Sequence, residues 1–205
     1  MCNRYRMSAS QADLARRYGI EMPYPEDESY PPGELFPDKP AWVVREEESR
    51  RILDVMSWGV PTQVPGKRID KATGKPVMLT KSVTNVRNLS SPFWRSMLDK
   101  PAQRCLVPVT TFSEYGQVRG ADGKLPLHWF DVPSRPIFSF AGIWRPSTAG
   151  ITFAFLTCEP NSVVGPIHPK AMPVILHDED EQRWLDGAPA VELAAPYPAQ
   201  LMTVD

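Results

Sequence analysis

Cys2, which directly follows Met1, offers a pair of reactive groups that no other residue type provides. Methionine is normally removed when the second residue is small, and the chain would then begin with a free cysteine. The α-amine has a pKa of about 7.7–8.0 and a free thiol one of about 8.5, so both react near neutral pH. Such a residue can attack an acyl group as an N-terminal nucleophile. It can also condense with an aldehyde to an imine, which the thiol closes to a thiazolidine. The plain alternative is a small residue that happens to follow Met1.

Glu114 and His168 are candidates for proton transfer. Glu114 follows a strongly apolar stretch and lies between Phe112 and Tyr115. A carboxylate in such surroundings is expected to have a raised pKa, which suits a general acid or base. His168 precedes a proline and opens the last predicted core strand. The alternatives are a solvated carboxylate on an edge strand for Glu114 and a structural histidine for His168.

Asn85 and Arg87 form a second candidate pair, because residues two apart on a strand face the same side. An amide that orients a reacting group and a guanidinium that binds phosphate would then share one surface. Positive charge is also concentrated around them, although the formal net charge is −1. Between residues 67 and 104 the acidic residues are Asp70 and Asp99. The basic residues of the same stretch are Lys67, Arg68, Lys71, Lys75, Lys81, Arg87, Arg95, Lys100 and Arg104. A neutral protein with one basic face can bind a phosphate backbone, but an ordinary mixed surface is the simpler interpretation.

The cysteines and the apolar segments exclude several classes of protein. Three cysteines, none in a CxxC pair, predict neither a disulfide framework nor a zinc site, and Cys105 and Cys158 lie in apolar runs typical of buried residues. The amino terminus has no apolar signal-like region, and no run of 18 apolar residues occurs. We expect a cytoplasmic protein that needs no membrane, metal or organic cofactor.

Three short helices are expected around a set of strands. Residues 8–19 begin with a capping-box pattern of Ser10 and Asp13 and end at Gly19. A second helix should start near Ser91 and Pro92 and end before Pro101, and a third should span 179–186. Residues 21–40 are expected to form an irregular loop and 61–75 a basic flexible loop.

Short β-branched and aromatic runs predict the strands 42–45, 104–109, 128–132, 137–144, 151–158 and 172–177. The connections are too short for crossover helices, so neighbouring strands should be antiparallel. The expected fold class is therefore α+β: one domain over residues 1–205, with a curled antiparallel sheet or barrel and peripheral short helices.

Taken together, the motifs resemble those of the SOS response-associated peptidase (SRAP) family, which crosslinks abasic sites in DNA. The resemblance covers most of the chain and rests on the order and spacing of many short segments. These are MCNRY at residues 1–5, MSWG at 56–59, NVR at 85–87, RCLVP at 104–108, FSEY at 112–115, AGIW at 141–144, LT at 156–157, IH at 167–168 and MPVIL at 172–176.

The resemblance implies a role for each candidate residue. Cys2, exposed by removal of Met1, which the family is thought to catalyse itself, would form a thiazolidine with the ring-opened sugar of an abasic site in single-stranded DNA. Asn85 would hold the N-terminal group or the sugar, Glu114 would shuttle protons, and His168 would assist at the sugar hydroxyl. The remaining implied residues contact DNA: Arg4, Arg87 and Lys170 at phosphates, and Trp58 by stacking on bases. A monomer that joins the nucleoid when bound to DNA is expected.

The chain departs from the family pattern at four places. Asn3 replaces the usual glycine, and YPPG at residues 30–33 replaces the usual Tyr-Asn-x-Ala-Pro segment. After His168 the chain reads Pro169 and Lys170, with one extra residue before the MPVIL segment, and Tyr115 replaces the usual tryptophan.

Two functions of other classes remain open. One is a non-covalent reader of damaged or modified DNA, whose binding would be salt-sensitive and would survive loss of Cys2. The other is an N-terminal-nucleophile amidohydrolase or thiol peptidase that acts on other proteins, which the basic stretch argues against. A globular protein without any such site is the remaining alternative.

Overall fold

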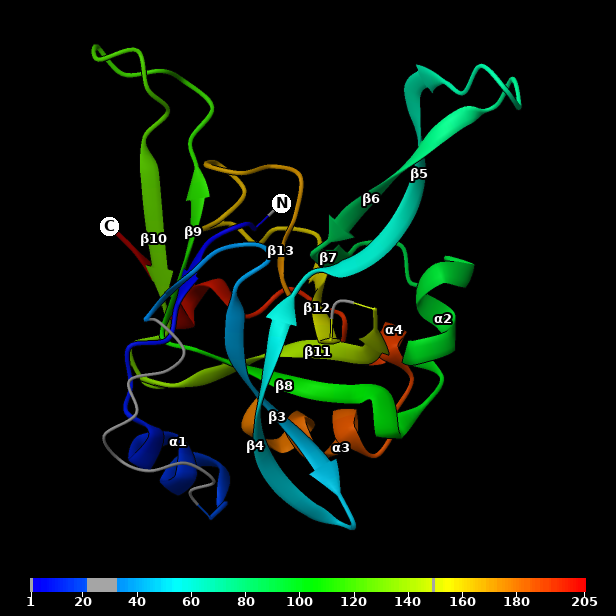
Figure 1. Cartoon of the computed structure of the whole chain (residues 1–205). Coiled ribbons are helices and arrows are strands. Elements are labelled where there is room, and N and C mark those ends of the chain that lie inside the picture. Colours follow the sequence, from blue (N-terminus) through cyan, green and yellow to red (C-terminus); the bar gives the residue numbers. More distant parts are fainter. Residues whose placement is uncertain (1, 22–32, 149) are drawn as a thin grey trace.

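A five-stranded barrel forms the centre of the molecule (Figure 1). The computed structural model describes residues 2–21, 33–148 and 150–205. The barrel strands are β3 (Pro40–Glu47), β4 (Arg50–Trp58), β8 (Arg104–Val109), β11 (Phe138–Ser147) and β12 (Gly150–Cys158). They pair in the order β12, β4, β3, β8 and β11, and β11 pairs again with β12, which closes the ring. β8 is buried at every residue, in agreement with its uninterrupted apolar sequence.

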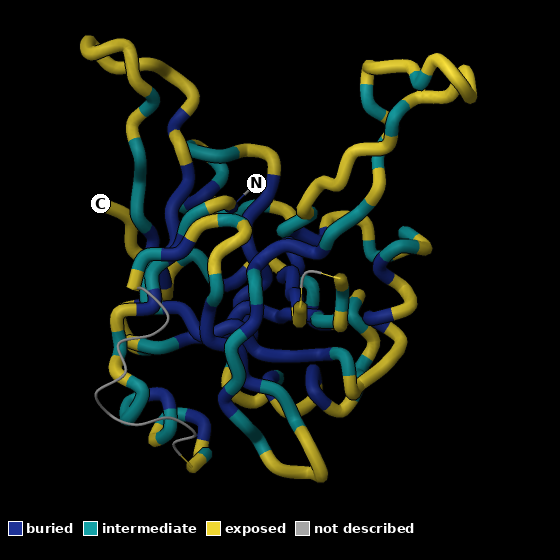
Figure 2. Tube along the Cα trace, viewed as in Figure 1, coloured by how far each residue is buried: buried dark blue, intermediate teal, exposed yellow. Residues whose placement is uncertain are grey.

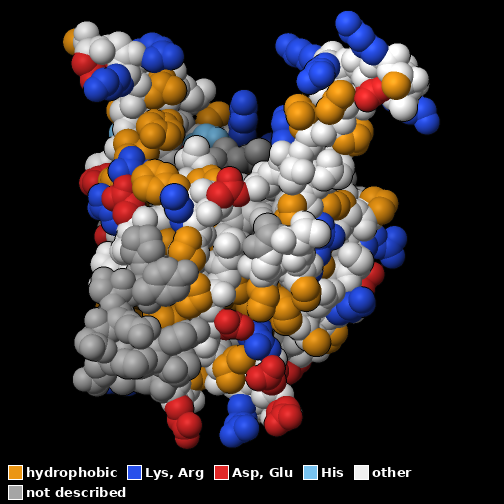
Figure 3. Space-filling model, viewed as in Figure 1, with side chains coloured by type: hydrophobic (Ala, Val, Ile, Leu, Met, Phe, Trp, Pro, Cys, Tyr) orange, Lys and Arg blue, Asp and Glu red, His pale blue; other side chains and the backbone are white. Residues whose placement is uncertain are grey.

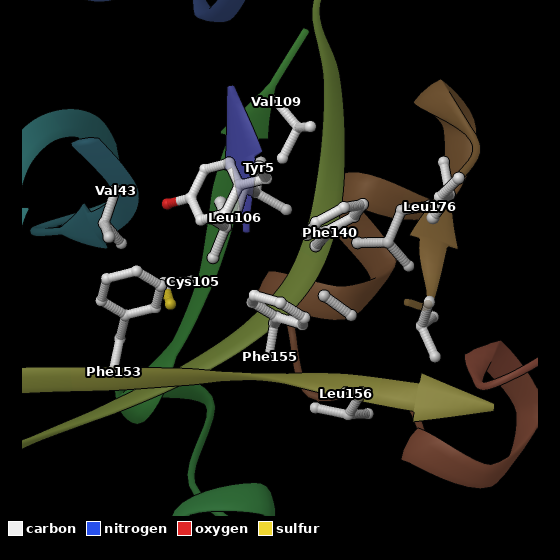
Figure 4. Packing of buried hydrophobic residues seen from close by; sticks show 14 of the residues in the cluster. Tyr5, Val43, Cys105, Leu106, Val109, Phe140, Phe153, Phe155, Leu156 and Leu176 are labelled. Carbon is white, nitrogen blue, oxygen red and sulfur yellow. The ribbon is translucent and has the colours of Figure 1, made fainter. Parts of the chain in front are cut away.

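Aromatic and aliphatic side chains together fill the barrel interior (Figure 4). Phe140, Phe153 and Phe155 are fully buried, and the ring centroids of Phe140 and Phe155 are 4.8 Å apart. Tyr5 enters this core from outside the barrel, with its ring centroid 6.1 Å from that of Phe140. The N-terminal segment is therefore anchored by core packing rather than by the backbone alone.

A second sheet lies beside the barrel and carries the N-terminal segment. It runs in the order β15 (Thr203–Val204), β10 (Leu127–Asp131), β9 (Thr111–Tyr115), β1 (Tyr5–Arg6) and β2 (Glu34–Leu35). β1 pairs antiparallel with β9, with Tyr5 opposite Phe112, and on its other side with β2. This pairing places residues just before β1 next to the middle of β9.

Short helices and strands complete the structure. The helices are α1 (Gln11–Tyr18), α2 (Pro92–Leu98), α3 (Asp178–Leu185) and α4 (Ala190–Leu193), with 3-10 turns at Pro101–Gln103 and Ala199–Leu201. β7 (Asn85–Val86), β13 (Met172–Pro173) and β14 (Ile175–Leu176) pair with barrel strands. The predicted capping box of α1 is present, and Gly19 ends the helix with φ of 67°. No helix in the described ranges has the length and apolar character needed to cross a membrane.

Residues 61–75, predicted as a flexible loop, instead belong to a long two-stranded ribbon, so that prediction is wrong. The ribbon consists of β5 (Val60–Ile69) and β6 (Pro76–Val83), paired antiparallel with an irregularity between Pro65 and Ile69. It projects from the body and is largely exposed (Figures 1 and 2). Cross-strand hydrogen bonds outweigh the local proline and glycine content that favoured a loop.

The α+β class with a curled, barrel-like sheet and peripheral helices is confirmed. The predicted strand 104–109 matches β8, and the three predicted helices are present with boundaries shifted by a few residues. The expectation of antiparallel neighbours holds for consecutive strands, but β12 pairs in parallel with β4 and β7. β4 and β9 were not predicted, because their mixed polar and apolar residues do not alternate simply.

A buried carboxylate, Glu181, ties α3 to three other parts of the fold. Its side chain is 2% exposed and forms ion pairs with Arg17 at 2.7 Å, Arg135 at 3.6 Å and Arg51 at 3.7 Å. The Ser139 hydroxyl donates a hydrogen bond of 2.6 Å to the same carboxylate. Removing the acid would leave Arg51 without an ion-pair partner among the described residues, and Arg17 and Arg135 with only the exposed Asp178.

Glu181→Ala is therefore expected to lower the free energy of unfolding by about 3–5 kcal/mol, as for other broken buried ion pairs. Urea denaturation of wild type and variant measures the difference. Glu179→Ala, at an exposed position of the same helix, is the matched control and should change stability by less than about 0.5 kcal/mol. Equal effects of the two substitutions would contradict a stabilising role for the Glu181 cluster.

Candidate active site

Cys2 lies in the interior, three residues before β1, and is 1% exposed. Its Sγ lies 3.5 Å from the Arg4 carbonyl oxygen and 3.9 Å from that of Ser113, so the thiol donates to the backbone of its own segment and of β9. Burial, and next the negative charge of Glu114, raise the pKa of the Cys2 thiol well above its ordinary value. The thiol is therefore protonated at rest and needs a proton acceptor to become a nucleophile.

Asn85, which is far from Cys2 in the sequence, contacts it in the fold. Its Nδ2 donates hydrogen bonds to the Cys2 carbonyl oxygen at 2.9 Å and to Thr84 Oγ1 at 2.7 Å. Its Oδ1 is buried and has no hydrogen-bond partner within the described part of the chain. The amide thus fixes the Cys2 backbone and leaves one acceptor available for a further N–H or O–H group.

Glu114, on β9 directly after Ser113, is 3% exposed. Burial raises the pKa of Glu114 to about 7, so that both the acid and the carboxylate are populated at neutral pH. This is the range in which a carboxyl group transfers protons most effectively in both directions. The sequence-based expectation of a raised pKa agrees with this environment.

His168 faces Glu114, with its Nε2 3.7 Å from Glu114 Oε2. Its Nδ1 lies 2.9 Å from the Ala171 carbonyl oxygen, which can only accept, so Nδ1 carries the proton and Nε2 is the nitrogen near the carboxylate. Burial lowers the pKa of His168 and favours the neutral ring. Burial therefore favours the neutral form of both groups, the protonated carboxyl of Glu114 and the uncharged ring of His168.

The four residues predicted to be catalytic are thus brought into one cluster from four separate segments. Cys2 contacts Asn85 directly and influences Glu114 electrostatically, and Glu114 adjoins His168. The arrangement combines a thiol, an amide and a carboxyl–imidazole pair, which is a set suited to nucleophilic and acid–base chemistry at a carbonyl carbon.

Two of the predicted phosphate-binding residues lie together near this cluster. The Arg87 guanidinium donates a hydrogen bond of 3.1 Å to the Lys170 carbonyl oxygen, and both side chains are exposed. His168 is two residues before Lys170, so the pair lies close to the carboxyl–imidazole pair. The altered sequence after His168 nevertheless places a lysine beside Arg87.

Arg4 is held by an acidic residue that the sequence did not single out. Its Nε donates to Glu34 Oε1 at 2.6 Å, and the neighbouring Arg6 donates to Glu34 Oε2 at 3.2 Å. Burial opposes ionisation of Glu34, but the two guanidinium groups outweigh it and lower its pKa. Arg6 also lies over the Trp129 ring, 3.7 Å from its centroid. A DNA phosphate would have to share or displace Glu34 to reach Arg4.

Trp58, predicted to stack on DNA bases, is a core residue instead. Its side chain is fully buried, stacks on Phe155 at 5.2 Å between centroids and donates its indole N–H to the Thr84 carbonyl oxygen at 3.1 Å. An indole enclosed on both faces has no surface for a base, so Trp58 does not belong to the DNA-contact surface. Local sequence could not reveal this, because the burial arises from strands distant in the chain.

The other departures from the family pattern affect the surface. Asn3 is exposed, so its side chain does not crowd the Cys2 thiol. Tyr115 is 41% exposed and points away from the core. Of the predicted segment 30–33, only Gly33 lies among the described residues, and its carbonyl oxygen accepts the Met7 N–H at 2.8 Å.

Sequence reasoning missed Ser113, Glu34 and Arg6 as neighbours of the site. Ser113 adjoins Glu114, and its carbonyl oxygen and hydroxyl both contact the N-terminal segment. Arg4 and Arg6 are two apart on an extended segment, a spacing that indicates a shared face. That spacing was the available signal for a paired anion site, but it does not identify Glu34 as the partner.

Comparison with protein families matches residues 1–205 to the family described as SOS response associated peptidase (SRAP). The chain belongs to the SRAP family. Two curated relatives in Bacillus subtilis (strain 168) are named abasic site processing proteins. The chain is 26% identical to YoqW over 191 residues, covering 91% of this chain and 80% of the relative. It is 25% identical to YobE over 191 residues, covering 91% and 82%.

Solved structures share the SRAP fold described above. A protein from Bacteroides thetaiotaomicron is similar with a TM-score of 0.72 at 22% identity, covering 99% of this chain and 90% of that chain. A protein from Bordetella bronchiseptica gives a TM-score of 0.71 at 23% identity, covering 99% and 98%. At these identities the likeness concerns the fold.

The raised pKa of Glu114 predicts a pH-dependent stability. Folding shifts this pKa from 4.5 to about 7, so the folded chain binds the proton more tightly than the unfolded chain. The resulting stability, about 3 kcal/mol, is fully present below pH 4.5 and is lost as the pH rises through 7. Glu114→Gln should remove this part of the decline between pH 4.5 and 7, measured by urea denaturation. Glu179→Gln is the control. An unchanged pH slope in Glu114→Gln would contradict the buried, proton-retaining carboxyl group.

Proposed function

We propose that this protein captures abasic sites in single-stranded DNA by forming a thiazolidine between Cys2 and the ring-opened sugar. The observation that carries the proposal is the convergence of Cys2, Asn85, Glu114 and His168 in one buried cluster. Membership of the SRAP family and relatives named abasic site processing proteins support the same substrate. The protein would act as a monomer on DNA in the cytoplasm and shield the lesion.

The reaction begins once Met1 has been removed, because its peptide bond occupies the Cys2 nitrogen. The free amine attacks the aldehyde carbon of the open sugar, a C–N bond forms, and water leaves after two proton transfers to give an imine. The thiol sulfur then adds to the same carbon. The electron pair of the C=N bond goes to nitrogen, which takes up a proton in place of the one that sulfur loses. One water is released overall, and no oxidant or reductant is required.

Glu114 is suited to both proton transfers of this sequence. Near its pKa of about 7 it can donate a proton to the departing hydroxyl group as the imine forms. The carboxylate that results can accept the proton of the Cys2 thiol, whose raised pKa keeps it protonated until then. His168, fixed by the Ala171 carbonyl oxygen, would accept a hydrogen bond from a sugar hydroxyl through its unprotonated Nε2.

Asn85 would position the nucleophile. Its Nδ2 already holds the Cys2 carbonyl oxygen, and its buried Oδ1 is an acceptor that the Cys2 amine can use. This hydrogen bond would orient the nitrogen lone pair toward the aldehyde carbon. Closing the imine to a ring also removes the electrophile that would otherwise promote β-elimination and strand cleavage.

Phosphates on either side of the sugar would be bound by exposed cations. Arg87 and Lys170 lie together beside His168, and Arg4 would exchange part of its contact with Glu34 for a phosphate. We also propose that the same cluster removes Met1. The Cys2 thiol would attack the Met1 carbonyl carbon, the C–N bond to the Cys2 nitrogen would break as that nitrogen takes up a proton, and water would hydrolyse the resulting thioester to release methionine and restore the thiol.

The covalent step is tested with a single-stranded oligonucleotide that carries one abasic site, analysed on a denaturing gel. Wild type that has lost Met1, confirmed by intact mass, should give a heat-stable shifted band. Cys2→Ala should give none, because it lacks the thiol that closes the ring. Cys158→Ala, at a half-buried cysteine away from the cluster, is the control and should behave as wild type. A stable band from Cys2→Ala would contradict the mechanism, and binding without a band in wild type would favour a non-covalent DNA reader.

The role of Glu114 is tested by separating rate from affinity. Glu114→Gln should slow crosslinking at saturating DNA by about 100-fold or more, the usual contribution of a general acid–base group, while the dissociation constant changes little. The wild-type rate should also follow a group that titrates near pH 7, and the variant rate should not. Glu159→Gln, at an exposed carboxylate, is the control. Equal losses of rate and affinity would reduce Glu114 to a structural role.

A further inference from the structure

We propose that the β5–β6 ribbon is a second DNA-contact surface, which binds the single strand beyond the abasic site. The proposal rests on the proposed DNA-binding function and extends it to a part of the molecule outside the Cys2 cluster. The hairpin of β9 and β10 also projects from the body and is called the β9–β10 arm below. The ribbon projects on the opposite side from this arm (Figure 1). Figure 3 shows basic side chains at the tips of both arms and a hollow between them.

The ribbon is long and regularly paired. Its register runs from Val60 opposite Val83 at the base to Ile69 opposite Pro76 near the tip. At the usual rise per residue, the seven steps from Val83 to Pro76 span about 23 Å. Almost all of β6 is exposed (Figure 2). The ribbon therefore contributes little to the core, and its length needs another explanation.

The tip of the ribbon is a formed turn rather than a loose loop. Asp70 Oδ1 accepts the N–H groups of Ala72 at 2.8 Å and Thr73 at 2.9 Å, and its own N–H donates to the Lys75 carbonyl oxygen at 2.8 Å. Gly74 closes the turn with φ of 67°. The carboxylate of the tip is thus occupied by the backbone, and the turn holds its basic side chains on a fixed frame.

Four exposed cations surround this turn: Lys67, Arg68, Lys71 and Lys75. None of them has an ion-pair partner among the residues that the structure describes. Exposed arginines at the far end of the molecule differ, since Arg16 pairs with Asp13 and Arg183 with Asp180. Uncompensated positive charge on an extended arm is complementary to a phosphate backbone.

Exposed apolar side chains between the base and the tip of the ribbon favour binding of single-stranded DNA over duplex DNA. Leu79 is 49% exposed and faces Val64 across the ribbon, on the side that also carries Lys81. Met78, on the other side, is 51% exposed. An unpaired strand presents base faces that can lie against such side chains, whereas a duplex presents mainly phosphates and base edges.

The base of the ribbon leads directly into the site. Val83 ends β6, and Asn85, which holds the Cys2 carbonyl oxygen, follows two residues later. A strand that leaves the Cys2 cluster past Asn85 would therefore meet Lys81 and Leu79 before the basic tip. The ribbon would add contacts several nucleotides from the lesion without touching the reacting atoms.

The test compares Lys67→Gln/Arg68→Gln/Lys71→Gln with Arg16→Gln/Arg50→Gln/Arg183→Gln, which removes the same charge from the far end. Both are made in a Cys2→Ala background, so that binding is measured without closure of the thiazolidine ring. The probes are abasic single strands, one of about four nucleotides and one longer than about 16 nucleotides, the range of known single-strand sites. Circular dichroism and urea midpoints establish that each variant is folded.

The ribbon variant should bind the long strand about 10- to 100-fold more weakly at near-physiological salt. The slope of log K against log salt should shrink by about 2, as expected for three lost contacts to a single strand. The ribbon variant should bind the short strand with the affinity of the parent. The far-end variant should bind both strands with the affinity of the parent. Unchanged affinity and slope on the long strand, or an equal loss in the far-end variant, would overturn the proposal. A third probe carries a duplex flank beside the abasic single strand, and a loss confined to this probe would overturn the single-strand assignment.

The two proposals fail in distinguishable ways. Absence of a Cys2-dependent crosslink would remove the covalent function while leaving the length-dependent binding measurable. The same ribbon substitutions are also made in a chain that keeps Cys2. Normal crosslinking of both strands by that chain, together with parent-like binding of the long strand in the Cys2→Ala background, would remove the ribbon surface and leave the covalent function intact.

Discussion

The antiparallel pairing of β1 with β9 is the constraint on which the site depends. Tyr5 lies opposite Phe112, so the residues before β1 run beside Ser113 and Glu114. The Tyr5 ring stabilises the pairing, because it is buried against the barrel side chains Trp58, Phe140 and Phe155. A cysteine three residues before Tyr5 is thereby held against the strand that carries the carboxyl group. The position of Cys2 is a consequence of core packing more than of contacts within the site.

The same packing determines the electrostatics. The buried Glu114 and the partly buried His168 lie side by side, and burial disfavours the charged form of each, raising the pKa of Glu114 and lowering that of His168. Near pH 7 the acid and the carboxylate of Glu114 are both populated, while the ring of His168 is held toward its neutral form. A buried carboxyl group costs stability once it ionises, and a carboxyl group held at such a cost is a candidate for proton transfer. By contrast, Glu181 is buried among three arginines and stays structural.

Much of this arrangement could be predicted, because it depends on residues that are neighbours in the sequence. The Ser10 and Asp13 capping box, the apolar β8 and the raised pKa of Glu114 follow from neighbours in the sequence. The four catalytic candidates were found through the order of short motifs, and the fold brings them together. Features set by distant strands could not be predicted in this way. The burial of Trp58 and the Arg4–Glu34 pair belong to this group, as does the pairing that turns a proline-rich stretch into the ribbon.

The most direct test of the account is the mass of the covalent complex after treatment with borohydride. A thiazolidine at Cys2 predicts the mass of the chain without Met1 plus the abasic oligonucleotide minus one water, unchanged by the reductant. Tandem fragmentation should then place the adduct on Cys2. A complex that gains two hydrogens on reduction would be an open imine, and an adduct on a lysine would exclude Cys2 as the capturing residue. Either result would contradict the assignment of the buried cluster as a thiazolidine-forming site.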